Sequence, residues 1–399
     1  MINWKKGVNI GALTYAGVCI VSALLLPGWF NFPLDNLLFP VAFIHFLAVW
    51  KKRRDLRLLL GSFVALFLVG VISELINHQA IHVSHFLTLL LILKVPVLLT
   101  AFLENEVIDF RFKTVETIID AVFLTLFALN LFMAIDPGGW GYSLQEFYVP
   151  KSYTNLVYYN EWGTFRLSGV FSNPNNNALV FAVFFLYYSF FRKHSWQFAA
   201  LALLLLPLTQ SRTVFIALSI VGFLALLSRF DRNHLKKYWY LIPLVGTVVT
   251  GIVYSSSNLR SLFNFDAFTS NSLLQRIGNF QKFSEGGSGS LIGGGVIDDP
   301  KSTLDIFFDS EFIAVLFQHG ILGLIGLFLI FFHLFFGNYM TSLKKEWRSV
   351  ILLILVASMT NTTFLNGQAN VVLGFFLGLM ILKDNEISTP RKNPDTDPK

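Results

Sequence analysis

The chain has few charged residues and a single cysteine. Charged residues make up 14% of its 399 residues, whereas about a quarter of the residues are charged in a soluble globular protein. The lone Cys19 cannot form an intrachain disulfide, so the chain has no disulfide framework. The composition therefore excludes both an ordinary soluble globule and a cross-linked extracellular module.

Several motifs are also missing. The sequence contains no GxxxxGK[ST] phosphate loop and no pattern typical of a soluble serine triad, which disfavours a nucleotide hydrolase and a soluble serine hydrolase. No small-residue cleavage site follows the first apolar run, so we expect a retained helix there and not a cleaved signal peptide. No internal repeat is present. The apolar segments are therefore the main source of information about the fold.

Long apolar runs dominate the sequence. Hydrophobic residues make up 54% of the chain, and 43 residues are Phe. Runs of about 16 to 23 residues recur along almost the whole length, as expected for helices that cross a hydrocarbon core about 30 Å thick. We predict an all-α, polytopic integral membrane protein with about 12 transmembrane helices. The predicted spans are 7–27, 33–50, 56–76, 84–103, 115–135, 177–191, 196–209, 213–229, 238–254, 311–337, 349–365 and 370–382.

Most Lys and Arg residues lie on one side of the predicted spans. Clusters at 51–57, 229–237 and 344–348 fall on this side, which the positive-inside rule assigns to the cytoplasm together with both termini. The basic residues on the other side are Lys151, Arg166, Arg212, Arg260, Arg276, Lys282 and Lys301. Topology thus accounts for the net charge of +6, and no nucleic-acid partner is needed.

Residues 1–382 are predicted to form one membrane domain in the cytoplasmic membrane, with two large extracytoplasmic loops, 136–176 and 255–310. The polar tail 383–399 is expected to be disordered. The first loop is rich in Trp and Tyr, which predicts an ordered element at the membrane interface. The second contains "NSLLQRIGNFQKF", with the apolar spacing of an amphipathic helix, followed by a glycine-rich stretch that predicts a mobile flap.

Three arginines on the predicted outer side lie beside span ends or beside the amphipathic segment: Arg166, Arg212 and Arg276. Guanidinium groups bind phosphate oxygens bidentately and keep their charge, which suits a diphosphate held at a membrane surface. Alternatively, each arginine anchors a span end among the lipid headgroups. The sequence leaves both interpretations open.

The motif "SNPNNN" places several amides where a loop enters a predicted helix. Asn173, Asn175, Asn176 and Asn177 surround Pro174. A helix N-terminus with free donors suits an anion or a sugar hydroxyl, so the motif is a candidate substrate-binding site. Capping of the helix by asparagine, with proline in its first turn, explains the same residues equally well.

Acidic residues gather before the tenth predicted span. In "VIDDPKSTLDIFFDSEF", Asp305, Asp309 and Glu311 approach the membrane surface together. Crowding and partial burial can raise the pKa of a carboxylate, so Asp309 is a candidate general base for a sugar hydroxyl. A solvated acidic face and a divalent-cation site are the alternatives. Lys301 and Glu311 are further candidates for substrate binding.

Other ionisable residues lie in or near predicted spans. Glu74, His78, His82 and His85 would form one stripe on an unbroken helix, with metal-ligand potential, but the stripe crosses a predicted turn, which favours an ordinary interfacial turn. Lys94 lies inside a predicted span. It is a functional candidate, with snorkelling or pairing with a carboxylate such as that of Asp120 as the alternatives.

Four stretches together resemble the O-antigen ligase and O-antigen polymerase superfamily of bacterial envelope enzymes. They are "RLSGVFSNPNNNA", "LTQSRTVFIAL", "LLQRIGNF…LIGGGV" and "DSEFIAVLFQHGILGLIG", and they cover roughly residues 160 to 330. The resemblance implies an all-helical fold that transfers a glycan from a polyprenyl diphosphate carrier to an acceptor on the outer face of the membrane. It places Arg166, Arg212 and Arg276 where arginines of the family engage the diphosphate.

The resemblance favours a polymerase over a ligase. Ligases of the superfamily have a histidine base at the position that Asp309 occupies here. The chain is more similar to polymerases that join undecaprenyl-diphosphate-linked oligosaccharide repeat units for capsular polysaccharide or exopolysaccharide. Membrane lipids and a chain-length regulator and flippase of the same pathway are the implied partners, with no cofactor and no metal. Transfer of glycan to another wall or lipid acceptor, and a flippase for lipid-linked oligosaccharide, are the alternatives.

Overall fold

The computed structural model describes residues 4–27, 34–78, 82–105, 112–148, 167–171, 173–192, 195–209, 211–229, 291–295, 310–359 and 367–388. Within these ranges all regular secondary structure is helical, in agreement with the predicted all-α class. The main helices are α1 (Trp4–Leu25), α2 (Leu34–Lys52), α3 (Arg57–His78), α4 (Val83–Ala101), α5 (Phe112–Ile135), α6 (Trp140–Tyr148), α8 (Pro174–Leu186), α9 (Trp196–Thr209), α10 (Arg212–Arg229), α16 (Glu311–Phe336), α17 (Lys344–Ser358) and α18 (Gly367–Ser388). Short 3-10 turns at Arg54–Leu56 and Pro137–Gly139 precede α3 and α6, and a π-helical turn at Tyr187–Phe191 continues α8.

Five helical segments are long and apolar enough to cross a membrane: Lys5–Leu25, Arg54–Asn77, Val83–Ala101, Val115–Ile135 and Glu311–Phe336. Their length and composition confirm the prediction of a helical, membrane-embedded protein. α9 and the first part of α10 are apolar but shorter. The total of about 12 spans stays a prediction, and the predicted span 238–254 lies outside the described residues.

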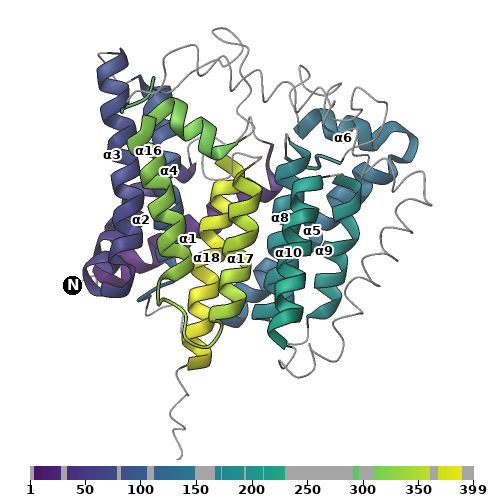
Figure 1. Cartoon of the computed structure of the whole chain (residues 1–399). Coiled ribbons are helices and arrows are strands. Elements are labelled where there is room, and N and C mark those ends of the chain that lie inside the picture. Colours follow the sequence, from purple (N-terminus) through teal and green to yellow (C-terminus); the bar gives the residue numbers. More distant parts are fainter. Residues whose placement is uncertain are drawn as a thin grey trace, which may run out of the picture.

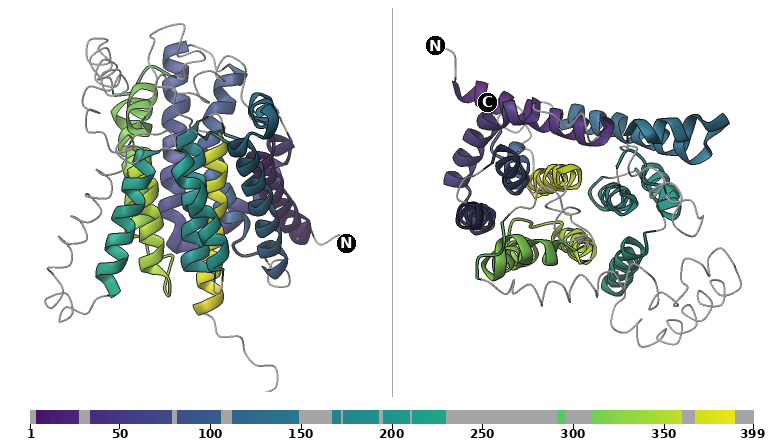
Figure 2. Two further views of the ribbon diagram at one scale, coloured as in Figure 1. Left: turned by 90° about the vertical axis from the view of Figure 1, so that its right-hand side faces the viewer. Right: turned by 90° about the horizontal axis from the view of Figure 1, so that it is seen from above.

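The helices form a bundle with two sides that α17 and α18 join (Figure 1). On one side α3 packs against α4 and α16, and on the other side α8 and α5 pack against α9. α18 contacts both α4 and α8, and α17 contacts both α16 and α10. Figure 2, seen from above, shows the same arrangement. We call the two sides the α3–α4–α16 side and the α5–α8–α9 side.

Two glycines bring α18 close to α4. A Cβ built on Gly374 would lie 2.9 Å from the carbonyl oxygen of Val95, and a Cβ built on Gly378 would lie 2.9 Å from the Cα of Leu99. The two glycines are four positions apart in the sequence, so they lie on one face of the helix. Small residues at this spacing let helix backbones approach closely in a membrane, where packing and not the hydrophobic effect holds helices together.

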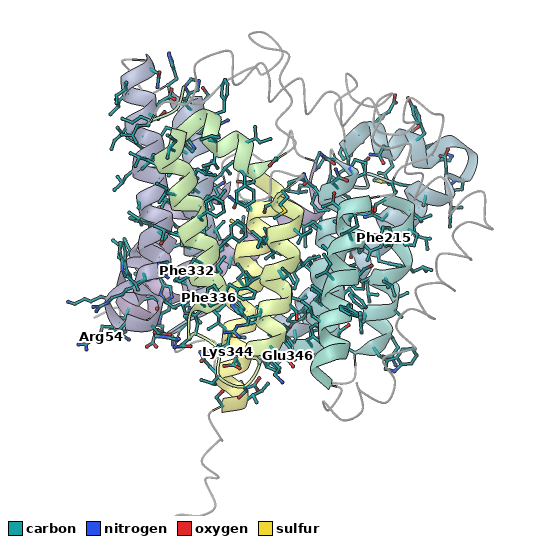
Figure 3. The ribbon with its side chains drawn as sticks, in the orientation of Figure 1. Arg54, Phe215, Phe332, Phe336, Lys344 and Glu346 are labelled. Carbon is teal, nitrogen blue, oxygen red and sulfur yellow. The ribbon has the colours of Figure 1, made fainter. Side chains whose placement is uncertain are left out.

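The two ends of the bundle differ from its flank. α8, α10 and α16 begin at the upper end in Figure 1, and α3 finishes there. Figure 3 shows Arg54, Lys344 and Glu346 at the lower end and Phe332 and Phe336 on the flank of α16, where the two rings are 54% and 56% exposed. A charged end and an exposed apolar flank are typical of a bundle surrounded by lipid.

The polar tail begins later than the sequence predicts. α18 continues to Ser388, so residues 383–388 are helical and not part of a disordered tail. The cause is Asp384, whose carboxylate accepts hydrogen bonds from the backbone of the loop before α17: Thr341 N (2.7 Å), Ser342 N (2.8 Å) and Leu343 N (2.6 Å). Residues 389–399 lie outside the described part of the chain.

The aromatic first loop contains an ordered element, as predicted. α6 buries Gln145 and Tyr148 and leaves Trp140 and Phe147 exposed. The Tyr148 hydroxyl donates to the carbonyl oxygen of Leu25 at 2.9 Å, which ties α6 to the end of α1. Burial raises the pKa of the Tyr148 phenol, so the hydroxyl remains a donor.

Candidate functional site

The upper end of the bundle brings together the described parts of the resembling stretches. "NPNNNA" leads into α8, "SRTVFIAL" begins α10 and "SEFIAVLF" begins α16, and all three helices start at this end (Figure 1). The glycine-rich segment 291–295 lies against α16. Free backbone donors and the helix dipole make a helix N-terminus attractive to anions. The upper end is therefore the candidate functional site.

Asn173 is the N-cap of α8. Its side-chain oxygen accepts a hydrogen bond from Asn175 N at 2.8 Å, and Pro174 occupies the first helical position. The Asn173 carbonyl accepts from Asn176 N at 3.1 Å and from Asn177 N at 3.2 Å. The capping interpretation of the motif is thus confirmed for Asn173. Asn175 is half-buried and Asn176 is buried, so the amides do not form one exposed cluster.

A buried amide cluster holds the segment before α8 in place. Asn177 Nδ2 donates to Asn130 Oδ1 at 2.8 Å and to the Leu167 carbonyl at 3.2 Å. Gln145 contacts the Ser168 hydroxyl and donates to the Gly169 carbonyl at 3.2 Å. The amide cluster, formed by Asn130, Gln145, Ser168 and Asn177, therefore fixes residues 167–171 against α5, α6 and α8. The Leu167 amide also donates to the Leu208 carbonyl at 2.8 Å, which links the segment to α9.

Arg212 is the first residue of α10. Thr209 closes α9, and Ser211 N donates to Thr209 Oγ1 at 3.3 Å. The Ser211 carbonyl accepts from Phe215 N at 3.1 Å at the start of α10. The backbone of Arg212 lies at the upper end, where α10 begins (Figure 1), while its side chain is outside the described part of the chain.

Glu311 is the first residue of α16 and is fully buried. An acidic residue in the first turn of a helix interacts favourably with the helix dipole. Complete burial of a carboxylate at this place also requires polar or cationic neighbours. The burial excludes a solvated surface position for Glu311.

α16 is broken near its upper end. Gly320 has φ 68° and ψ −164°, a conformation that is essentially restricted to glycine. The segment 291–295 pairs with the broken turn through its backbone. The hydrogen bonds run from Gly294 N to Phe317 O (2.8 Å), from Gly295 N to Gln318 O (3.0 Å) and from Leu322 N to Leu291 O (3.2 Å). Backbone groups released by the break are thus satisfied by a distant segment, as a membrane interior requires.

Two polar residues of α3 also bond to the segment 291–295 and to the broken turn of α16. The Ser73 hydroxyl bonds to the carbonyl oxygens of Gln318 (2.7 Å) and Ile292 (3.0 Å). Asn77 Nδ2 donates to the Gly293 carbonyl at 3.0 Å. The glycine-rich segment at 291–295 is therefore held between α3 and α16, and the prediction of a mobile flap is wrong for these five residues.

A group of ionisable residues lies directly beside the break. α3 ends at His78 and α4 begins at Val83, which confirms the predicted turn. Glu74 and His85 are 0% and 3% exposed and contact each other through Oε1 and Nδ1. His319, immediately before Gly320, is also buried, at 1% exposure. In the described ranges, no group of three or more His, Cys, Asp or Glu side chains is arranged to hold a metal ion.

Sequence reasoning missed the contact of Glu74 with His85 and the position of His319. The available signal was a histidine inside the predicted span 311–337, because an ionisable side chain in a membrane span is costly and marks function by default. Lys94 is buried within α4, as its place in a span predicts. Asp120 accepts a hydrogen bond from the Tyr188 hydroxyl at 3.0 Å and forms an ion pair with Arg192.

Arg166, Arg276, Lys301 and Asp309 lie outside the residues that the structure describes. The grouping of the three arginines around one diphosphate therefore stays a prediction, as does the role of Asp309 as the base. No protein-family model matches the chain, and no curated protein matches it.

Proposed function

We propose that this protein is a membrane glycosyltransferase that joins undecaprenyl-diphosphate-linked oligosaccharide repeat units on the outer face of the cytoplasmic membrane. The observation that carries the proposal is the common position of the starts of α8, α10 and α16 at one end of the bundle (Figure 1). Each start belongs to a stretch that resembles the O-antigen polymerase superfamily. Three helix N-termini at one end supply positive dipole ends toward an anionic lipid carrier.

The proposed reaction is an inverting displacement. The acceptor hydroxyl forms a bond to the anomeric carbon while the bond from that carbon to the diphosphate oxygen breaks. The leaving undecaprenyl diphosphate takes the electron pair, and Arg166, Arg212 and Arg276 offset its growing charge. Asp309 takes the proton of the hydroxyl. A diphosphate is already a good leaving group, so positioning and charge stabilisation supply most of the catalysis.

The test uses the purified protein in nanodiscs with a synthetic polyprenyl-diphosphate-linked repeat unit. We expect longer glycans from the wild type and a loss of about 100-fold or more in rate for Arg212→Ala, because one fixed charge contributes on this scale to stabilising a transition state. Arg212→Lys should retain part of the activity. Arg229→Ala, at the opposite end of α10, is the matched control and should retain all of it. Full activity in Arg212→Ala would refute the proposal.

A flippase for the same lipid-linked units is the second candidate. The observation that favours it is the break in α16 beside buried ionisable residues, because transporters commonly bind substrates at broken helices. A deletion strain separates the two functions. Single repeat units that accumulate outside the membrane indicate a polymerase, units trapped inside indicate a flippase, and long lipid-linked chains indicate a ligase.

A further inference from the structure

The short helix α6 presents two exposed aromatic side chains on one face. Trp140 is 71% exposed and Phe147 is 52% exposed. Residues seven positions apart lie two turns apart on the same side of a helix, so the two Cα atoms are separated by about 10 Å along its axis. Ser143 is exposed between them. We call Trp140, Ser143 and Phe147 the outer face of α6.

α6 is held in place at its start, middle and end. At its start, Asp136 Oδ1 accepts a hydrogen bond from Tyr142 N at 2.9 Å. In its middle, the buried Gln145 donates to the backbone of the segment 167–171. At its end, the Tyr148 hydroxyl donates to the backbone of α1. A surface fixed in this way loses little conformational entropy when it binds a ligand.

α6 belongs to the candidate site. Figure 1 shows it at the upper end of the bundle, where α8, α10 and α16 begin. The bond from Gln145 to the Gly169 carbonyl joins it to the segment that leads into α8. In the proposed reaction the diphosphate lies at the helix N-termini and its sugars extend away from the membrane, so the glycan needs support at this end.

Trp196 is the counterpart of Trp140 at the other end of the bundle. It is the first residue of α9, as Trp140 is the first of α6, and it is 70% exposed. α9 finishes where α10 begins, at the upper end, so Trp196 lies at the lower end. The exposed residues one to three turns after it are all apolar: Ala200, Leu203, Leu204 and Pro207. Such a continuous apolar face beside a tryptophan is typical of a helix in contact with lipid.

The outer face of α6 has a different chemistry. The Ser143 hydroxyl lies between the two rings, and Glu146 follows one turn later at the edge of the face, half-buried. A carboxylate is disfavoured among acyl chains. The faces of aromatic rings carry partial negative charge, which attracts the C–H groups of a sugar ring. The oxygens of Ser143 and Glu146 can accept hydrogen bonds from the sugar hydroxyls.

We propose that the outer face of α6 binds the glycan of the lipid-linked repeat unit. Trp140 and Phe147 stack against successive sugar rings, and Ser143 and Glu146 bind the hydroxyl groups at their edges. No bond forms or breaks here, so these four are positioning residues that hold the sugars while the transfer takes place at the helix N-termini. The inference rests on the proposed function, because it identifies where the substrate of that reaction is held.

The test measures binding by the full protein in nanodiscs. The probe is a repeat-unit oligosaccharide prepared by partial hydrolysis of the host strain's surface polysaccharide, which lacks the diphosphate and therefore binds without turnover. Saturation-transfer difference NMR should show transfer from aromatic protons of the protein to sugar C–H protons. We expect Trp140→Ala to raise the Kd about tenfold or more, because a tryptophan at the centre of a contact contributes on this scale. Trp140→Phe keeps a ring and should retain most of the affinity.

Trp196→Ala is the matched control. Trp196 is equally exposed but lies at the other end, so its removal should leave the Kd unchanged. Both alanine variants change an exposed side chain and should leave thermal unfolding unaltered. An unchanged Kd in Trp140→Ala would overturn the proposal, and the proposed function would then depend on the result for Arg212→Ala alone.

Quenching by brominated phospholipids distinguishes glycan from lipid as the occupant. The chain has 8 tryptophans, so the fluorescence of one of them is taken as the difference between the wild type and its Trp→Phe variant. We expect strong quenching of Trp196 and little quenching of Trp140. Equal quenching of the two would show that lipid covers the outer face of α6, and the glycan proposal would be abandoned.

Discussion

The two sides of the bundle use buried polar residues in different ways. On the α5–α8–α9 side the fully buried polar groups of the amide cluster are neutral, and they bond to one another and to the backbone of residues 167–171. The ion pair of Asp120 with Arg192 on this side is only half-buried. On the α3–α4–α16 side neutral groups such as Ser73 and Asn77 fix the backbone, and the ionisable Glu74, His85 and His319 are buried as well.

This difference distinguishes buried residues that stabilise the fold from buried residues that are candidates for a chemical role. Neutral amides that pair with one another stabilise a fold without a change of charge, so the amide cluster is explained by the position of the segment that it holds. Buried ionisable groups cost more and can exchange protons, so they need another explanation. The stability of single variants, measured as apparent thermal unfolding in detergent, tests this distinction.

The largest effect is expected at the break in α16. Gly320→Ala forces a side chain into a glycine-only backbone conformation and brings its Cβ to 2.7 Å from Ile292 N. Backbone strain and overpacking together should destabilise the protein by roughly 2 to 6 kcal/mol and release residues 291–295. Gly222→Ala on α10 is the control, because no atom lies within 4 Å of its added Cβ. Equal stability of the two variants would mean that the break is not a fixed element.

A smaller loss is expected in the amide cluster. Asn177→Ala removes the donor for Asn130 Oδ1 and for the Leu167 carbonyl, both in the buried interior. Leaving buried acceptors unsatisfied should cost about 2 to 4 kcal/mol. Asn338→Ala is the matched control, because among the described residues the Asn338 side chain accepts only an exposed bond from Lys344. It should change stability by no more than about 0.5 kcal/mol. A similar effect of both substitutions would contradict the structural role of the cluster.

The sequence predicts the helices better than the contacts between them. Apolar runs locate α3, α4, α5 and α16 to within a few residues, because length and hydropathy alone determine whether a helix fits a bilayer. The predicted end of the last helix was wrong, because a tertiary contact of Asp384 with a distant loop extends α18. Such a contact leaves no periodic signal in the sequence.

In the candidate site, too, the sequence predicts local structure better than contacts between distant segments. "SNPNNN" predicts a helix start correctly, since capping depends on neighbouring residues. The pairing of residues 291–295 with the turn at Gly320 joins segments far apart in the sequence, so neither segment alone predicts it. The residues from Glu74 to His85 likewise predict only a turn between two helices. The contact of Glu74 with His85 depends on the packing of α3 against α4, which these residues alone do not predict.

The smallest effect is expected at Asn173, where the two interpretations of "SNPNNN" can be separated. Its side-chain oxygen caps α8, so Asn173→Ala should cost about 1 kcal/mol of stability. Asn173→Ser restores a capping oxygen on a shorter side chain and should recover stability. If capping is the whole role, Asn173→Ser also retains activity on the lipid-linked repeat unit. If the Asn173→Ser variant is stable but inactive, the lost carboxamide contacts the substrate. The α5–α8–α9 side then contributes to substrate binding as well as to the stability of the fold.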